Sequence, residues 1–206
     1  EKIALTKEEL NTFLTLAKDD ARPVLYTAWH TLAYTGLRRG ELLGLEWSDI
    51  DFKNKTISIN RTLVSINGRL SVQSPKTKRS TRTISLDEST VQILKDWKLE
   101  QKKTFFKNGI KSRNIVITNT VGGYFDFGNF REDLKTFISK HKLKQFSVHS
   151  LRHTHASLLF EVGIEPNTIS DRLGHSNIQT TIDMYTHLND RQRSDVADRL
   201  LKFLEA

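Results

Sequence analysis

The sequence predicts an α+β fold, in which a mostly helical single domain contains a small three-stranded antiparallel sheet. Two patterns support this prediction. Apolar residues recur at helical spacing along most of the chain, whereas the window 51–86 alternates and is rich in β-branched residues. A chain of 206 residues is long enough to bury one full core without cross-links. We therefore expect one domain over residues 1–206.

Helix start and stop signals define the first elements. Thr6 and Glu9 form a T-x-x-E capping box, and the apolar spacing that follows predicts a helix over about 7–18. Pro23 is typical of a first helical turn, and Gly36 can end the helix that it begins.

The next segment, TGLRRGELLGLEW at 35–47, supplies core leucines around a charged pair. Arg38 follows the glycine directly, where its side chain can reach a bound anion, and Glu41 lies one turn further on. Taken alone, this segment favours an ordinary surface arginine with an i,i+3 partner.

Strand signals occupy the window 51–86. TISIN, TLVSI, RLSVQ and TRTISL alternate, and Asn67-Gly68 predicts a hairpin turn. Residues 75–79, PKTKR, form the loop before the last strand, where a lysine could reach outward. These lysines could equally be solvated and have no function.

The second half is expected to be helical at 89–103, 127–140, 149–162, 166–173, 177–188 and 191–204, with a short strand at 114–118. The arc of the 149–162 helix that is expected to face the core contains Leu151, His155, Leu158, Leu159 and Val162. His149, Arg152 and His153 fall on the opposite arc. We expect this polar trio to face away from the core, beside the positive end of the helix.

Two further polar residues lie near the carboxyl terminus. His175 follows Gly174 on a turn, and Tyr185 shares a helical face with Ile178 and Ile182. A tyrosine at that spacing is, by itself, more typical of a core residue than of a nucleophile.

The net charge of +8 is unevenly distributed. Residues 53–86 carry 8 basic residues and no acid, and residues 135–160 carry 5 with none, whereas both ends of the chain are acidic. Two long acid-free windows favour a surface that binds a polyanion.

Composition excludes several classes of protein. There is no cysteine, so disulfides and thiol catalysis are impossible, and we expect a reducing, cytoplasmic compartment. The sequence contains no 18-residue apolar run and no signal peptide, so nothing in it predicts insertion into a membrane. The P-loop and G-x-S-x-G motifs are absent. The first residue is Glu1, so we expect a fragment of a longer protein.

The histidines suggest a zinc site as an alternative. However, HSLRH lacks the glutamate of the HExxH motif, and Arg152 between His149 and His153 would repel a cation. We therefore expect no metal.

Five segments together resemble the catalytic domain of the tyrosine recombinases, the phage and transposon integrases. They are TGLRRGELLGL (35–45), PKTK (75–78), HSLRHTHAS (149–157), LGHSNIQTT (173–181) and the Tyr185 of DMYTHL. They occur in the family's order, and Tyr185 lies ten residues beyond the LGH histidine. Each signal is modest, but their combination is specific and favours functional roles for Arg38 and Tyr185.

The resemblance implies a role for each matching residue. Tyr185 would attack the scissile phosphate, Arg38 and Arg152 would bind its oxygens, and His149 would transfer protons. Lys76 would protonate the leaving 5′-oxygen, although spacing alone does not exclude Lys78 or Arg79. His175 would bind the phosphate or position the tyrosine, and Glu41 would support the site.

The resemblance also implies partners and assembly. We expect double-stranded DNA with attachment sites, a homotetramer on that DNA, a possible directionality factor and no cofactor. An amino-terminal DNA-binding domain is expected to be absent from this fragment. The backbone contacts expected within the two basic windows are Lys53, Lys55, Arg61, Lys78, Arg79, Arg82, Lys142 and Lys144.

Two competing functions share these features. A type IB topoisomerase would use nearly the same chemistry to relax supercoils without pairing two sites. A DNA-binding module without catalysis would keep the basic surface and form no covalent adduct. The target sequence, and the choice between integration, excision and resolution, are not encoded in any of these motifs.

Overall fold

The computed structural model describes residues 3–74, 81–111, 113–175, 177 and 179, and the following elements lie within them. The helices are α1 (Lys7–Asp20), α2 (Pro23–Thr35), α3 (Arg39–Leu43), the 3₁₀ turn η1 (Trp47–Asp49), α4 (Glu88–Lys107), α5 (Phe127–Lys140), α6 (Val148–Glu161) and α7 (Pro166–Leu173). The strands are β1 (Ile50–Asp51), β2 (Thr56–Ile59), β3 (Thr62–Ile66), β4 (Arg69–Gln73) and β5 (Arg82–Ser85).

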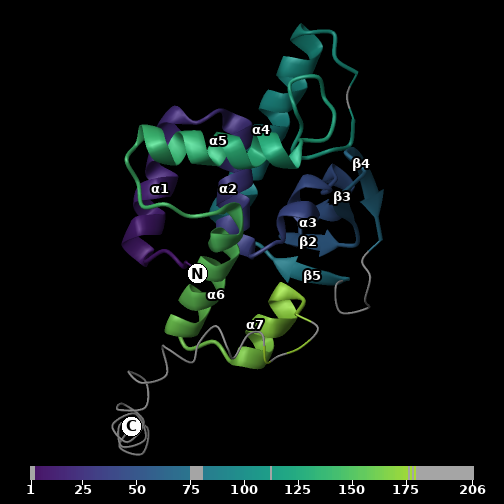
Figure 1. Ribbon diagram of the computed structural model, residues 1–206. Coiled ribbons are helices and arrows are strands. Elements are labelled where there is room, and N and C mark those ends of the chain that lie inside the picture. Colours follow the sequence, from purple (N-terminus) through teal and green to yellow (C-terminus); the bar gives the residue numbers. More distant parts are fainter. Residues whose placement is uncertain (1–2, 75–80, 112, 176, 178, 180–206) are drawn as a thin grey trace, which may run out of the picture.

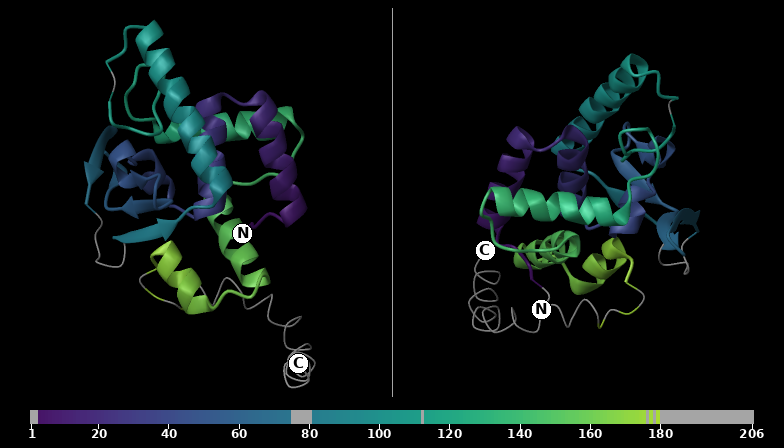
Figure 2. Two further views of the ribbon diagram at one scale, coloured as in Figure 1. Left: turned by 180° about the vertical axis from the view of Figure 1, so that it is seen from behind. Right: turned by 45° about the horizontal axis from the view of Figure 1, so that its top comes forward.

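The helices pack around α2. It contacts α1, α4 and α6, and its Trp29 is fully buried against Phe13 of α1 and Phe137 of α5. In Figures 1 and 2, α5 crosses α1 and α2 on one side while α4 lies on the other. The mostly helical α+β fold predicted from the sequence is confirmed.

Local signals set the helix ends as predicted. Thr6 accepts a hydrogen bond from the Glu9 amide at 3.1 Å, and Glu9 accepts one from the Thr6 amide at 2.9 Å, which completes the capping box of α1. Gly36 ends α2 in the left-handed conformation, with φ of 67°. The bounds of α5 and α7 are those predicted.

The strands divide between two small sheets. A three-stranded antiparallel sheet has the order β1-β2-β5, and β3 and β4 form a separate antiparallel hairpin around the turn at Asn67 and Gly68. The four predicted strand segments therefore do not share one sheet. The hairpin packs on α3 instead, and a Cβ at Gly40 would lie 2.6 Å from the Leu63 carbonyl oxygen. Only glycine permits this approach.

Two details of the second half differ from prediction. The expected strand at 114–118 is reduced to isolated bridges, Glu46 with Ile115 and Thr118 with Tyr124. Val162, expected to pack the core, is 74% exposed because α6 ends at Glu161 and Val162 caps it. The helices predicted at 177–188 and 191–204 lie outside the described residues.

The helices that the structure describes include none that combines the length and apolar character needed to cross a membrane.

Candidate active site

A glycine turn places Arg38 at the start of α3. Gly36 ends α2, and a Cβ at this position would lie 2.6 Å from both His155 and Leu173, so α6 and α7 approach the turn closely. Arg38 is the N-cap of α3, and its amide donates to Glu41 at 2.8 Å. Its guanidinium Nη1 also donates to Glu41, at 2.9 Å. The predicted pairing of Arg38 with Glu41 is therefore confirmed.

Glu41 is buried between two guanidiniums. Arg82, the first residue of β5, donates to its two carboxylate oxygens at 3.0 and 2.9 Å. Burial by itself raises the pKa of Glu41, but hydrogen bonds and positive charge from Arg82 and Arg38 outweigh burial and hold it below its usual range. The carboxylate is therefore charged at neutral pH and can orient both cations.

Arg152 lies within the core side of α6, which corrects the prediction that it faces away from the core. It is only 3% exposed, and it donates to the Gly36 carbonyl at 2.7 Å and the Leu173 carbonyl at 2.8 Å. Burial, followed by repulsion from Arg38, lowers the pKa of Arg152 to about 9. Two backbone carbonyls replace the water that the guanidinium loses.

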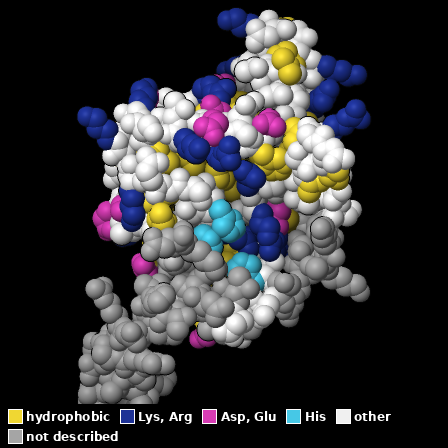
Figure 3. Space-filling view, viewed as in Figure 1, with side chains coloured by type: hydrophobic (Ala, Val, Ile, Leu, Met, Phe, Trp, Pro, Cys, Tyr) yellow, Lys and Arg dark blue, Asp and Glu magenta, His cyan; other side chains and the backbone are white. Residues whose placement is uncertain are grey.

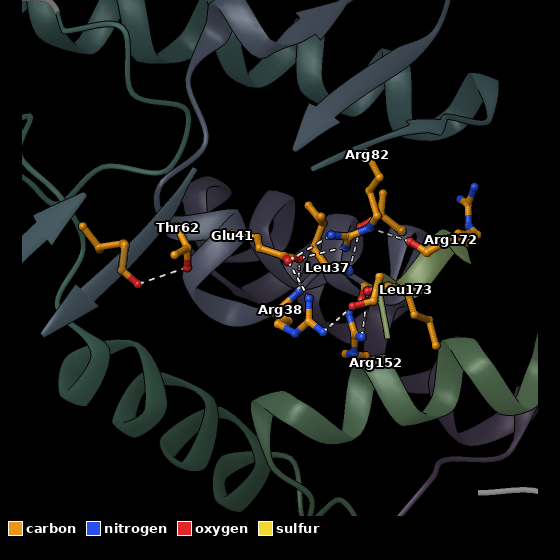
Figure 4. Close-up of polar contacts among 12 residues, drawn as sticks. Leu37, Arg38, Glu41, Thr62, Arg82, Arg152, Arg172 and Leu173 are labelled. Atoms are coloured by element: carbon orange, nitrogen blue, oxygen red, sulfur yellow. Dashed lines mark hydrogen bonds and ion pairs between the residues drawn. The ribbon is translucent and has the colours of Figure 1, made fainter. Parts of the chain in front are cut away.

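The carboxyl end of α7 binds the guanidiniums of Arg38, Arg82 and Arg152. Three successive carbonyls, those of Arg172, Leu173 and Gly174, accept hydrogen bonds from Arg82 at 2.7 Å, Arg152 at 2.8 Å and Arg38 at 2.7 Å, respectively. The last carbonyls of a helix have no partner within it and carry partial negative charge. Figure 4 shows that the guanidiniums of Arg38, Arg82 and Arg152 converge on this end of α7 from α3, β5 and α6.

Histidines lie beside this cluster. His175 follows α7 directly, and its pKa is lowered to about 4 by burial and by the charges of Arg152 and Arg38. His149 is exposed in the first turn of α6, and its ring contacts that of His153 with centroids 4.5 Å apart. On the face seen in Figure 3, histidine side chains lie next to Lys and Arg side chains.

A groove of about 710 Å³ opens next to these side chains. Arg38 and His149 line it together with Arg39, Arg131 and the β3 residues 62–65. It therefore joins one of the phosphate-binding candidates to the proton-transfer candidate, along a wall that carries three arginines.

The structure thus brings together Arg38, Glu41, Arg152 and His175, with His149 on the adjoining groove. Lys76 and Tyr185, together with the alternative residues Lys78 and Arg79, lie outside the described residues.

The expected backbone contacts occupy different environments. Lys53 and Lys142 are exposed. Lys55 forms an ion pair with Glu88, Lys144 with Glu9, and Arg61 with Glu46 and Asp49. Arg82 is buried beneath Glu41, where its guanidinium faces protein acceptors. The acid-free windows of the sequence are therefore partly neutralised by acids from other segments.

Sequence reasoning missed a second buried network behind the site. His155 donates from Nδ1 to the Ala33 carbonyl at 2.9 Å and accepts at Nε2 from Arg172 at 3.1 Å. These contacts join α2, α6 and α7. The placement of His155 on the buried arc was predicted and is confirmed, but nothing in the sequence indicated Arg172 as its partner.

Within the described residues, no three or more side chains of His, Asp or Glu are grouped so that they could hold a metal ion. The guanidiniums of Arg38, Arg82 and Arg152 are hydrogen-bond donors, which suit an anion.

Glu41→Gln should destabilise the fold strongly. The carboxylate is 5% exposed and its partner Arg82 is 8% exposed, so the variant leaves a buried cation without a counter-charge. Removing one partner of a buried pair costs about 3–5 kcal/mol. Urea unfolding at pH 7 measures the loss. Glu132→Gln, at a pair more than half exposed, is the matched control and should lose under about 1 kcal/mol. Equal losses would contradict the buried ion pair.

Acid should destabilise the protein through His155. Burial, followed by the charge of Arg172, lowers its pKa from 6.5 to about 4. The unfolded chain therefore binds more protons than the folded chain between these values, so stability is present above pH 6.5 and is lost as pH falls toward 4. The slope from this group is on the order of 1 kcal/mol per pH unit. Urea unfolding of His155→Gln at several pH values should give a shallower curve, and parallel curves would contradict this assignment.

Comparison with known proteins identifies the family. The family model described as the phage integrase family matches residues 4–192. The ICEBs1 integrase of Bacillus subtilis (strain 168) is 34% identical over 195 residues, which cover 94% of this chain and 52% of that protein. The integrase of Staphylococcus phage L54a is 33% identical over 189 residues, which cover 89% of this chain and 53% of that protein. The chain thus spans about half the length of these curated relatives.

Solved structures agree with the family match. The Tn1549 transposon integrase in complex with transposon right end DNA has a TM-score of 0.81 and 26% identity, covering 98% of this chain and 67% of that one. The XerA recombinase is similar in fold, with a TM-score of 0.72 over 96% of this chain and 62% of its own. The sequence motifs, the arginine cluster and these matches converge, and the chain belongs to the phage integrase family.

Proposed function

We propose that this chain is the catalytic domain of a site-specific DNA recombinase, which cleaves and rejoins strands through a 3′-phosphotyrosyl intermediate. The observation that carries the proposal is the pair of guanidiniums from Arg38 and Arg152, which α7 holds side by side. The family of the chain supports the same reaction, because its relatives include integrases and the similar structures include an integrase in complex with DNA.

The two guanidiniums keep donors for a phosphate. Among the described residues, Arg38 donates to Glu41 and Gly174, and Arg152 donates to Gly36 and Leu173, each through its two terminal nitrogens. A guanidinium has five N–H groups, so donors remain on each side chain for the non-bridging oxygens of a phosphodiester. These oxygens gain charge in the transition state, and preorganised donors stabilise that charge without reorganisation.

In the proposed reaction, protein side chains and the DNA account for every bond made or broken and for every proton transferred. The phenol oxygen of Tyr185 forms a bond to phosphorus while the bond to the 5′-oxygen breaks. His149 takes the phenol proton, and Lys76 gives a proton to the leaving 5′-oxygen. Free phenol has a pKa of about 10, so this assistance is needed at neutral pH. The phosphotyrosyl ester conserves the bond energy, and the reverse reaction rejoins strands without ATP or a cofactor.

His175 would act first as a neutral group. With its pKa lowered to about 4, it can hydrogen-bond the phosphate or Tyr185 without adding charge at neutral pH. A bound phosphate would offset the repulsion from Arg152 and Arg38 and raise this pKa.

Duplex DNA with attachment sites is the proposed substrate, with four copies of the chain assembled on two sites and a directionality factor as a further partner. Exposed Lys53, between β1 and β2, and exposed Lys142, between α5 and α6, are proposed backbone contacts.

The test is a covalent-adduct assay on nicked duplexes that carry candidate attachment sites. A denaturant-stable protein–DNA species supports the proposal, and its absence across a library of such sites favours a binding module. A second assay follows the pairing of two marked duplexes. Relaxation of supercoils without pairing would favour a type IB topoisomerase instead.

A further inference from the structure

Arg82 has the contacts of a positioning group. Its side chain is only 8% exposed, and all three of its guanidinium nitrogens donate to protein acceptors. Nε donates to the Arg172 carbonyl, and the two terminal nitrogens donate to the two oxygens of Glu41. Because Nε and both terminal nitrogens of Arg82 donate to protein acceptors, these contacts argue against the backbone contact expected from its basic window.

The contacts of Arg82 lead to Arg38 through one carboxylate. Glu41 Oε1 accepts from Arg38 Nη1 at 2.9 Å and from Arg82 at 3.0 Å, while Oε2 accepts from the Arg38 amide at 2.8 Å and from Arg82 at 2.9 Å. Each oxygen of Glu41 thus binds both arginines. Any rotation of the carboxylate that follows a loss of Arg82 would also move Arg38.

Arg82 also fastens β5 to α7. The same helix end that accepts its Nε hydrogen bond accepts Arg152 and Arg38 on the next two carbonyls. Because β5 pairs with β2, with Arg82 opposite Ile59, the bond ties the sheet to the helix that carries the phosphate-binding arginines.

We propose that Arg82 is a positioning residue, which fixes Glu41 and the carboxyl end of α7 so that Arg38 meets the scissile phosphate in its reactive orientation. This inference rests on the proposed recombinase function. Lysine cannot replace it, because one ammonium on a flexible stem cannot donate to three acceptors in a fixed planar arrangement.

The experiment compares Arg82→Lys with the unchanged chain on a nicked suicide duplex. The single-turnover rate of adduct formation should fall by about 10- to 100-fold, as expected for a misplaced reacting group. DNA affinity, measured by fluorescence anisotropy, should stay within about threefold and its salt dependence should not change, whereas loss of a phosphate contact would reduce the salt slope by about 1. Arg22→Lys, at an exposed ion pair with Asp133 outside both basic windows, is the matched control and should leave the rate unchanged.

A double-mutant cycle tests the route through Glu41. If Arg82 acts through the carboxylate, the double variant Glu41→Gln with Arg82→Lys should form the adduct no more slowly than the slower single variant. A double variant whose rate loss equals the product of the two single losses would overturn this route. Circular dichroism shows whether each variant is folded. If a variant is unfolded, the double variant Arg82→Met with Glu41→Gln is used in its place, because it removes both buried charges together. That double variant should fold, bind DNA and form the adduct as slowly as Glu41→Gln.

The outcomes separate the two proposals. An adduct from the unchanged chain with an equal rate for Arg82→Lys would overturn the positioning role alone. A reduced salt slope in Arg82→Lys would show a phosphate contact and would also overturn it. No adduct from the unchanged chain on any duplex would overturn the proposed function, and the positioning of a reacting phosphate with it.

Discussion

Replacing Tyr185 by phenylalanine is expected to abolish the covalent protein–DNA species, while DNA affinity stays within about threefold. The variant lacks only the oxygen that would join phosphorus, so no ester can form, whereas the proposed DNA-binding surface is retained. The measurement uses a nicked duplex labelled at the 5′ end of the cleaved strand. A 3′-phosphotyrosyl link predicts that this label migrates with the protein in a denaturing gel.

Tyr124→Phe is the matched control for this experiment. Tyr124 lies at the bridge with Thr118, away from the arginine cluster, and its carbonyl accepts from Asn119 at 3.1 Å. Its variant should form the adduct at the rate of the unchanged chain. An adduct of undiminished yield from Tyr185→Phe would falsify the assignment of the nucleophile.

Arg152→Lys should reduce the rate of adduct formation by about 100- to 1,000-fold, the usual cost of removing one preorganised donor to a developing anion. Arginine reaches the Gly36 and Leu173 carbonyls with two nitrogens and keeps further donors for the phosphate. Lysine offers one nitrogen on a flexible stem, so it cannot bind both carbonyls and the phosphate in the same geometry. Single-turnover kinetics on the nicked duplex measures the loss.

The same substitution should also lower the free energy of unfolding. Arg152 is 3% exposed, and a carbonyl left without a donor in that environment costs about 1–3 kcal/mol. Arg22→Lys, at an ion pair with Asp133 on the surface, is the matched control for both measurements. A rate within about threefold of the unchanged chain would contradict the role of Arg152 in phosphate binding.

The local elements of this fold were accessible to sequence reasoning because their causes are local. The capping box at Thr6 and Glu9, the prolines that open α2 and α7, and the glycine that ends α2 each act within a few residues. The division of the strands between two sheets could not be predicted, because alternation indicates a strand but not which strand it pairs with. The β3–β4 hairpin packs on α3, where Gly40 permits the close approach, and it is therefore separate from the other sheet.

In the candidate site, too, the sequence predicted the residues and the tertiary contacts decided their environment. The motifs selected Arg38, Glu41, Arg152 and His175, and the structure brings these residues together. The helical arc of Arg152 suggested an outward side chain, yet the turn at Gly36, 116 residues away, covers it. A periodicity argument assumes that the core lies on one side of a helix, and it fails where a second element buries the polar side.

By itself, the sequence determined the order and approximate bounds of the longer helices up to Leu173, the presence of a strand-rich basic window and the residue types of the described part of the site. Only the tertiary structure decided that Arg82 lies beneath Glu41 and that α7 presents three carbonyls to three arginines. The physical reason is that a backbone carbonyl has no residue-specific signature. Its role as an acceptor depends on where a helix ends relative to side chains from α3, β5 and α6, which meet only in the folded chain.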